Sequence, residues 1–196
     1  MWNWMIVMCL CVWTAGTGVA AGQSRVTAQR ESEIAPFVLA TYMHPALATY
    51  SYPEAANFGY AAGVDASPFM FRRFQPALEL RFTGDSGPLA HEYTCSGGLK
   101  AAILFRGIRP YATLLKGFDI IYFTYPIATP KGPYARDGSR MFSVGGGAEF
   151  DVGPSWQVRV DYSKQYWALA SPDIRPVAVS LGVAYRIPFR NGKMRD

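Results

Sequence analysis

The sequence predicts an all-β fold, an eight-stranded antiparallel barrel that crosses a membrane. Two observations carry this prediction. Stretches of about ten residues alternate between bulky apolar and small or charged side chains, and the links between them alternate between short and long. Alternation at every second residue gives a strand one apolar and one polar face. Outer-membrane barrels join such strands by short periplasmic turns and longer extracellular loops.

The composition is that of one compact domain. The chain has 196 residues, of which 50% are hydrophobic and 15% aromatic, so it is too apolar to be disordered. Its net charge of +5 comes from scattered basic residues interleaved with acidic ones. Nucleic-acid-binding domains gather their basic residues on one face, so we expect no nucleic-acid partner.

The first element is a predicted signal peptide, residues 1–21. An apolar core from Trp4 to Trp13 is followed by small residues, with Val19 and Ala21 in the positions that precede a cleavage site. The apolar run is too short for a spanning helix of ~20 residues, so we expect cleavage rather than anchoring. The remaining predicted divisions are a flexible periplasmic segment (22–33), the barrel (34–189) and a C-terminal tail (190–196).

Eight strands are predicted after the signal peptide. The third shows the pattern best, because even positions from Phe74 to Phe82 are apolar and the positions from Gln75 to Thr83 between them are polar or small. An even number of strands brings both termini to the same end of a barrel. In order, the predicted strands are Ala35–Met43, Asn57–Ser67, Phe74–Thr83, Glu92–Leu104, Arg109–Tyr122, Phe142–Val152, Trp156–Tyr166 and Val177–Phe189.

The links between these strands predict the orientation. Those after the second, fourth and sixth strands are short, and those after the first, third, fifth and seventh are longer and richer in Pro, Gly and charge. We assign the short links to the periplasmic side and expect the longest stretch, Phe123 to Arg140, to be the main extracellular loop. In the first and fifth strands, the residues divide less clearly into an apolar and a polar face. Leu114, Leu115, Lys116 and Asp119 fit neither face, which allows a β-bulge there.

Side-chain size indicates which face points inward. A soluble barrel would carry long polar side chains on its outer face, whereas here the polar faces are rich in small residues, as a crowded interior requires. The opposite faces are bulky and suit lipid. The small or charged faces of the second, fourth, sixth and eighth strands are Gly59, Ala61, Gly63, Asp65 and Ser67; Thr94, Ser96, Gly98, Lys100 and Ala102; Ser143, Gly145, Gly147, Glu149 and Asp151; and Ala178, Ser180, Gly182, Ala184 and Arg186.

The charges predicted to face inward are balanced. Charges inside an eight-stranded barrel are costly unless they are paired, so we predict a network of ion pairs that plugs the lumen. The alternative is a charge-lined, narrow channel for ions or small solutes. The predicted network consists of Asp65, Glu79, Glu149 and Asp161 with Arg81, Lys100, Arg159 and Arg186.

Aromatic residues are predicted to form girdles at the two membrane interfaces. Strand propensity alone accounts for part of this clustering. The predicted extracellular girdle is Tyr42, Phe58, Tyr93, Tyr122, Tyr125 and Tyr162, and the predicted periplasmic girdle is Phe69, Phe71, Phe105, Tyr111, Trp156 and Phe189.

The last strand carries a family resemblance. Ser180, Gly182, Tyr185, Ile187 and Phe189 resemble the C-terminal assembly signal of bacterial outer-membrane proteins, in which a polar residue and a glycine precede alternating apolar residues and an aromatic end. Together with this signal, the whole mature chain resembles the small eight-stranded barrels typified by the transmembrane domain of outer-membrane protein A. The peptidoglycan-binding domain of the longer relatives has no counterpart in the resemblance. The resemblance implies insertion by the outer-membrane assembly machinery. One departure is that seven residues follow Phe189, where the family usually ends.

The expected function is structural or surface-interacting, at the outer membrane of a Gram-negative bacterium. The extracellular loops would meet lipopolysaccharide and an unknown extracellular ligand. Some similar barrels are lipid hydrolases that use Ser, His and an acid. Here the only histidines are His44 and His91, with Ser86 and Glu92 near the second, so we expect no enzyme. No motif for a cofactor or a metal site is present, and we expect neither.

Overall fold

The computed structural model describes residues 31–47, 55–129, 132–169 and 174–190. The predicted signal peptide lies outside these residues. No helix in this part of the chain is long and apolar enough to cross a bilayer. The strands are β1 (Glu31–His44), β2 (Asn57–Ser67), β3 (Phe74–Ser86), β4 (Ala90–Ile103), β5 (Ile108–Thr129), β6 (Gly132–Asp151), β7 (Trp156–Trp167), β8 (Val177–Tyr185) and β9 (Ile187–Arg190).

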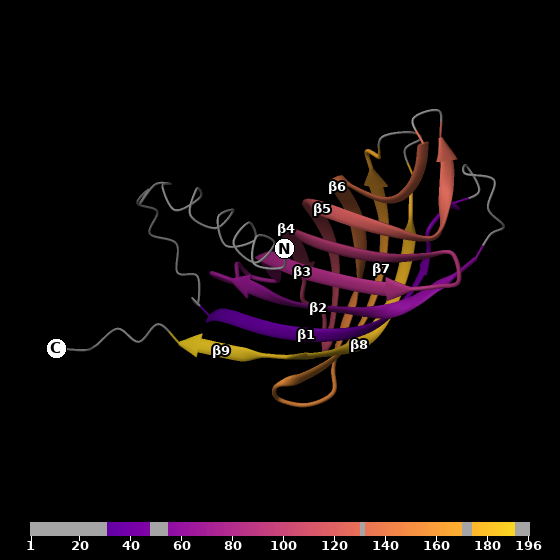
Figure 1. Cartoon of the computed structure of the whole chain (residues 1–196). Coiled ribbons are helices and arrows are strands. Elements are labelled where there is room, and N and C mark those ends of the chain that lie inside the picture. The colour runs from indigo at the N-terminus through magenta and orange to yellow at the C-terminus, as the bar shows by residue number, and fades with distance from the viewer. Residues whose placement is uncertain (1–30, 48–54, 130–131, 170–173, 191–196) are drawn as a thin grey trace, which may run out of the picture.

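The strands form one closed antiparallel barrel (Figure 1). Each strand pairs with its neighbours in sequence, and β1 closes the sheet by pairing with both β2 and β8. The short β9 continues β8, because Ala184 pairs with Phe37 and Ile187 pairs with Ile34 in the same register. The predicted all-β, eight-stranded antiparallel barrel is therefore confirmed, with β8 and β9 together as the eighth strand.

The pairing register shows how strongly the strands tilt. Partners can be followed from strand to strand around the barrel, and the path that leaves β1 at Ile34 returns to it ten residues further on, at His44. Such a stagger requires strands inclined to the barrel axis, typically by 35–45°. The path runs through Ile34, Ala66, Leu78, Leu99, Leu114, Val144, Lys164, Val177 and His44.

The two ends of the barrel differ. The start of β1 and the end of β9 lie together at one end, and the β5–β6 hairpin rises beyond the barrel at the other (Figure 1). The links after β2, β4 and β6 turn at the first end. The turn after β4 is tight, because the backbones of Phe105 and Ile108 hydrogen-bond to each other in both directions and Gly107 has a φ of +82°.

Two links differ from the sequence-based expectation. The link after β3 was expected to be long but spans only residues 87–89. The reason is that β3 ends three residues after its predicted end and β4 begins two residues before its predicted start. The predicted loop from Phe123 to Arg140 is instead mostly a β-hairpin, since β5 runs to Thr129 and β6 starts at Gly132. Its β-branched and aromatic residues favour strand over loop.

The two faces sort as predicted. Bulky side chains on the outer face are exposed, for example Leu99 (61%) and Leu181 (57%), whereas inner residues such as Ala61 (1%) are buried. A water-soluble barrel would bury the bulky side chains. The exposed apolar surface therefore fits a barrel surrounded by lipid.

The expectation of a bulge near Leu115 is wrong. β5 keeps one register with β6 from Ile108 to Tyr122, and the register shifts only between Tyr122 and Ile127. Leu115 therefore faces the interior and Lys116 faces outward. A slip of one residue would instead turn Arg109 and Asp119 toward lipid, which is far more costly than one outward lysine near the interface.

Candidate functional site

The most elaborate arrangement of polar side chains lies in the middle of the lumen. Arg159, on β7, has a completely buried side chain. Its guanidinium donates to Asp65 Oδ2 at 3.0 Å and to Glu79 Oε2 at 2.9 Å, and it also reaches Asp161 Oδ2 at 3.2 Å. One cation thus links carboxylates from β2, β3 and its own strand.

Arg81 connects two opposite walls. It extends from β3 and grips Asp161 on β7 with two hydrogen bonds of 3.0 and 2.8 Å. Its Nε also donates to Glu79 Oε1 at 2.6 Å. Because β3 and β7 lie four strands apart in a barrel of eight, this bidentate pair crosses the lumen.

Lys100, on β4, completes the network. Its Nζ lies 2.6 Å from Asp65 Oδ2 and is also paired with Glu149, on β6. Seven of the eight residues of the predicted network are therefore brought together as the central ion-pair network: Asp65, Glu79, Arg81, Lys100, Glu149, Arg159 and Asp161.

Two aromatic rings hold the central ion-pair network in place. The Arg159 Cζ lies 4.2 Å from the ring centroid of Phe37 and 4.8 Å from that of Tyr111. Tyr111 Oη accepts a hydrogen bond from Arg159 Nε at 2.9 Å and donates one to Asp161 at 2.6 Å. A Cβ on Gly147 would lie 2.7 Å from Tyr111 Oη, so glycine leaves the space that this ring occupies.

Tyr111 was expected in the periplasmic girdle, and this expectation is wrong. It alternates with Arg109 and Thr113, which also face inward, and its side chain is buried. Sequence reasoning also missed Phe37, because β1 had not been sorted into faces. The regular pairing of Phe37 with Gly63 on β2 places its ring in the lumen.

The eighth predicted network residue, Arg186, lies elsewhere. It belongs to a second network at the periplasmic end, where its Nε donates to Glu33 at 3.0 Å and its Nη1 donates to Asp151 at 3.3 Å. Arg109 also pairs with Glu33, at 3.4 Å. Glu33 was assigned to the flexible segment before the barrel, but β1 already starts at Glu31, which places Glu33 inside the lumen.

The extracellular end of the lumen holds carboxylates that have no basic partner among the described residues. Asp85, Glu92 and Asp119 are all buried there, and Glu92 is completely inaccessible. Asn57 donates to Asp85 at 2.8 Å and Ser139 donates to Asp119 at 2.5 Å. No three His, Cys, Asp or Glu side chains in the described part of the chain are arranged to hold one metal ion.

An apolar cluster covers these carboxylates. It packs residues of β4, β5, β6 and β7 against segments that follow β1 and β7. The described part of the interior therefore has four layers. From the periplasmic to the extracellular end, these are the network around Arg186 and Glu33, the central ion-pair network, the buried carboxylates and the apolar cluster. The buried members of the cluster are Leu47, Ala90, Ile121, Phe123, Met141, Trp167, Leu169 and Ile174.

The residues of the predicted assembly signal divide between the two faces. Ser180 and Gly182 face inward, and the Ser180 and Thr41 hydroxyls lie 2.9 Å apart. Tyr185, Ile187 and Phe189 are exposed on the outer face, where the Tyr185 ring contacts Trp156 with centroids 4.9 Å apart. The strand thus presents its aromatic and apolar residues to lipid.

The outer face also carries a hydroxyl and an imidazole side by side. Ser86 Oγ lies 2.8 Å from His91 Nδ1, and both side chains are exposed across the β3–β4 turn. The adjacent Glu92 points into the lumen and is buried, so it cannot orient His91. A catalytic triad requires an acid on the second imidazole nitrogen, and no such contact is present in the described residues.

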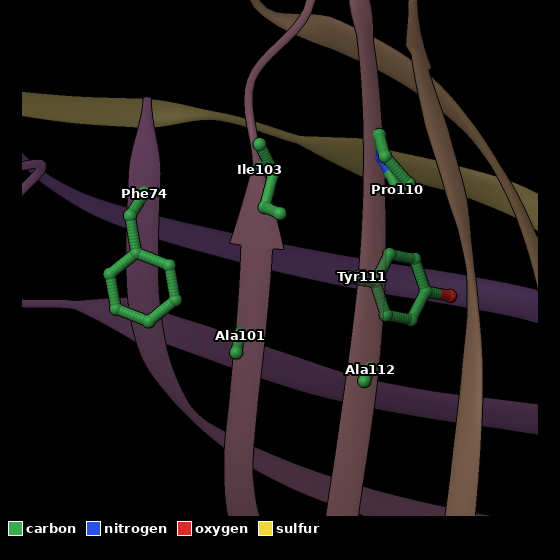
Figure 2. A pocket seen from close by; sticks show the side chains of 6 residues that line it. All are labelled: Phe74, Ala101, Ile103, Pro110, Tyr111 and Ala112. Carbon is green, nitrogen blue, oxygen red and sulfur yellow. The ribbon is translucent and has the colours of Figure 1, made fainter. Parts of the chain in front are cut away.

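A shallow apolar pocket opens on the outer face, across β3, β4 and β5 near the periplasmic end (Figure 2). Its volume is about 330 Å³. It forms where the small side chains Ala101 and Ala112 stand between the larger Phe74, Ile103 and Pro110. An apolar depression at this position suits the acyl chains of surrounding lipid.

Comparisons with known proteins identify the fold. Neisserial surface protein A (NspA) superimposes with a TM-score of 0.50 at 13% identity, over 79% of this chain and 96% of NspA. Ail, the attachment invasion locus protein of Yersinia pestis, gives 0.49 at 15% identity over 81% and 99%. The outer membrane enzyme PagL gives 0.40 at 16% identity over 80% and 99%. No protein-family profile and no curated protein sequence matches.

This protein has the fold of the small eight-stranded outer-membrane β-barrels. The identities are too low to transfer an activity, and they show the fold alone. Since one fold can host many functions, the function of this protein has to be argued from its own residues.

Proposed function

We propose that this protein is a non-enzymatic barrel of the bacterial outer membrane, with a closed lumen and a structural or surface-interaction role. The proposal rests on the ion pairs that cross the lumen, above all the bidentate contact between Arg81 and Asp161. An open channel would need these two walls to be separated by water. Here the side chains of opposite strands meet directly.

The surface role is assigned to the β5–β6 hairpin. It extends beyond the barrel at the end opposite to β9, and Thr124, Tyr125 and Pro126 are exposed on it (Figure 1). Such a projecting hairpin is accessible to an extracellular ligand, whose identity its composition does not specify. The outer-membrane assembly machinery is the proposed partner during insertion, through the strand that ends in Phe189.

Conductance in planar bilayers tests the closed lumen. The refolded mature protein should give no steady openings under conditions in which a general porin conducts. Double replacement of Arg81 and Asp161 by serine should raise the frequency of openings, because it removes the contact between opposite walls. Steady openings of the wild-type protein would contradict the proposal and favour the alternative, a narrow channel for ions or small solutes.

A lipid-hydrolysis assay tests the absence of enzymatic activity. Wild-type protein and His91→Ala should show the same background release of fatty acid from phospholipid and from lipid A. The contact between Ser86 and His91 makes this the relevant variant. Turnover that depends on His91 would overturn the non-enzymatic assignment.

A further inference from the structure

The outer face of the barrel carries its basic residues on one side only. In the described part of the chain, the outward-facing strand positions of β1 to β4 hold no lysine or arginine. Among the described residues, the outward-facing lysines and arginines of the barrel wall lie on β5 to β7 and on the segment leading into β8, at the extracellular end of the barrel. We call these residues the basic collar: Lys116, Arg136, Arg140, Lys164 and Arg175.

Three members of the basic collar converge around one aromatic patch. Lys164 Nζ lies 5.9 Å and Arg175 Cζ lies 6.0 Å from the ring centroid of Tyr166. The Tyr166 ring packs on Phe142, with centroids 6.4 Å apart. Phe142 in turn is the register partner of Lys116 on β5. The result is a continuous row of Lys116, Phe142 and Tyr166 with cations at both sides.

In the part of the chain that the structure describes, the outward-facing strand positions of β5 to β8 carry no aspartate or glutamate. At the same end of the barrel, Asp85, Glu92 and Asp119 are buried in the lumen behind the wall, and Asp137 alternates with the inward-facing Ser139 on β6. The wall therefore separates the basic collar from Asp85, Glu92 and Asp119. Exposed cations held beside aromatic rings at a membrane interface attract the phosphate groups of lipids.

The surface below the basic collar is apolar. On the same strands, Val144, Val160 and Val179 are exposed on the outer face toward the middle of the barrel. A ligand that fits both parts has an anionic headgroup at the extracellular interface and acyl chains along these strands. We propose that the basic collar binds a phosphorylated glycolipid of the outer leaflet, with the chemistry of lipid A, on the side of β5 to β8.

This proposal rests on the outer-membrane location in the proposed function, since only the outer membrane has a leaflet that contains phosphorylated glycolipid. It assigns the β5–β8 side to a bound glycolipid and leaves the uncharged, tyrosine-rich side of β1 to β4 to bulk lipid. Tyr42, Phe58 and Tyr93 stand at the corresponding positions there. The two sides should therefore differ in their affinity for phosphate.

The test measures binding of lipid A to the refolded mature protein in detergent by native mass spectrometry. The wild-type protein should retain bis-phosphorylated lipid A at least tenfold more strongly than dephosphorylated lipid A or phosphatidylglycerol. Replacing Lys116, Arg140, Lys164 and Arg175 together by glutamine should abolish this preference. The matched control replaces Arg72, Arg73 and Arg106, in the turns at the other end, by glutamine and should keep it.

Equal retention of phosphorylated and dephosphorylated lipid A by the wild-type protein would overturn the proposal. So would an unchanged preference in the fourfold variant, or a loss of the preference in the turn variant. The wild-type comparison does not depend on the folding of any variant. Since it is made in detergent, it is also independent of the conductance measurement, so the closed lumen and the glycolipid site can fail separately.

Discussion

Replacing Arg159 by methionine is the most direct test of how the central ion-pair network stabilises the barrel. The side chain is fully buried and contacts Asp65, Glu79 and Asp161 at 2.9–3.2 Å. Methionine keeps an unbranched stem, but it is shorter than arginine and has no charge. After the substitution, the four carboxylates of the network would have only Arg81 and Lys100 as cationic partners.

The expected magnitude follows from the charge left behind. Removing one partner from a buried ion pair typically costs about 3 to 5 kcal/mol, because a charge remains buried without compensation. We expect the free energy of unfolding of Arg159→Met to fall by about this amount. Urea titration of protein refolded in lipid vesicles, followed by tryptophan fluorescence, measures it. The control is Arg73→Met, at an exposed turn residue, which should change stability by less than about 0.5 kcal/mol.

A double variant separates charge from packing. Adding Glu79→Gln to Arg159→Met removes one of the uncompensated carboxylates, so part of the lost stability should return. A loss below about 1 kcal/mol for Arg159→Met would refute the reasoning, because it would mean that the network contributes little. No recovery in the double variant would show that lost packing against Phe37 and Tyr111, rather than charge, dominates.

Three further predictions concern packing, the turn and the fold itself. Gly147→Ala should destabilise the barrel by about 1 to 3 kcal/mol, because its methyl group would clash with the Val160 carbonyl oxygen and lie 2.7 Å from the Tyr111 hydroxyl. Gly153→Ala should be nearly neutral, since nothing lies within 4 Å of its Cβ. Urea unfolding compares the two variants, and equal effects would contradict the packing argument. Gly107→Ala should cost about 1 kcal/mol by the same measurement, because Gly107 has a φ of +82°, and an unchanged midpoint would argue against this turn conformation. The refolded mature protein should migrate faster in an unheated detergent gel than after boiling; a single band position in both lanes would speak against a stable barrel.

Much of the architecture could be predicted from the sequence because a strand in lipid obeys a simple rule. Its side chains alternate between hydrocarbon and a narrow interior, so residue size and polarity report the face directly. This rule predicted the eight strands and the inward position of Asp65, Lys100 and Arg159. It failed in β5, where Leu115 faces inward and Lys116 outward against the simple pattern.

The partners inside the lumen were harder to predict. The predicted inward faces carried a balanced set of charges, but which charges meet depends on the stagger between strands that are distant in sequence. That stagger carries Arg186 to the periplasmic end, beside Glu33, and brings Arg81 across to Asp161. No sequence signal placed Tyr111 beneath Arg159, because the glycine that makes room for its ring lies on another strand.

The sequence by itself determined the number of strands, which side chains point into the lumen and that the opposite side chains face lipid. These features depend on a period of two residues along one strand. Only the tertiary structure decided which buried charges pair, that β5 and β6 continue as a projecting hairpin, and that the outward-facing basic residues gather on one side. These features depend on the closed register around the barrel. Closure brings residues together across the lumen and around the wall, at separations that local alternation does not encode.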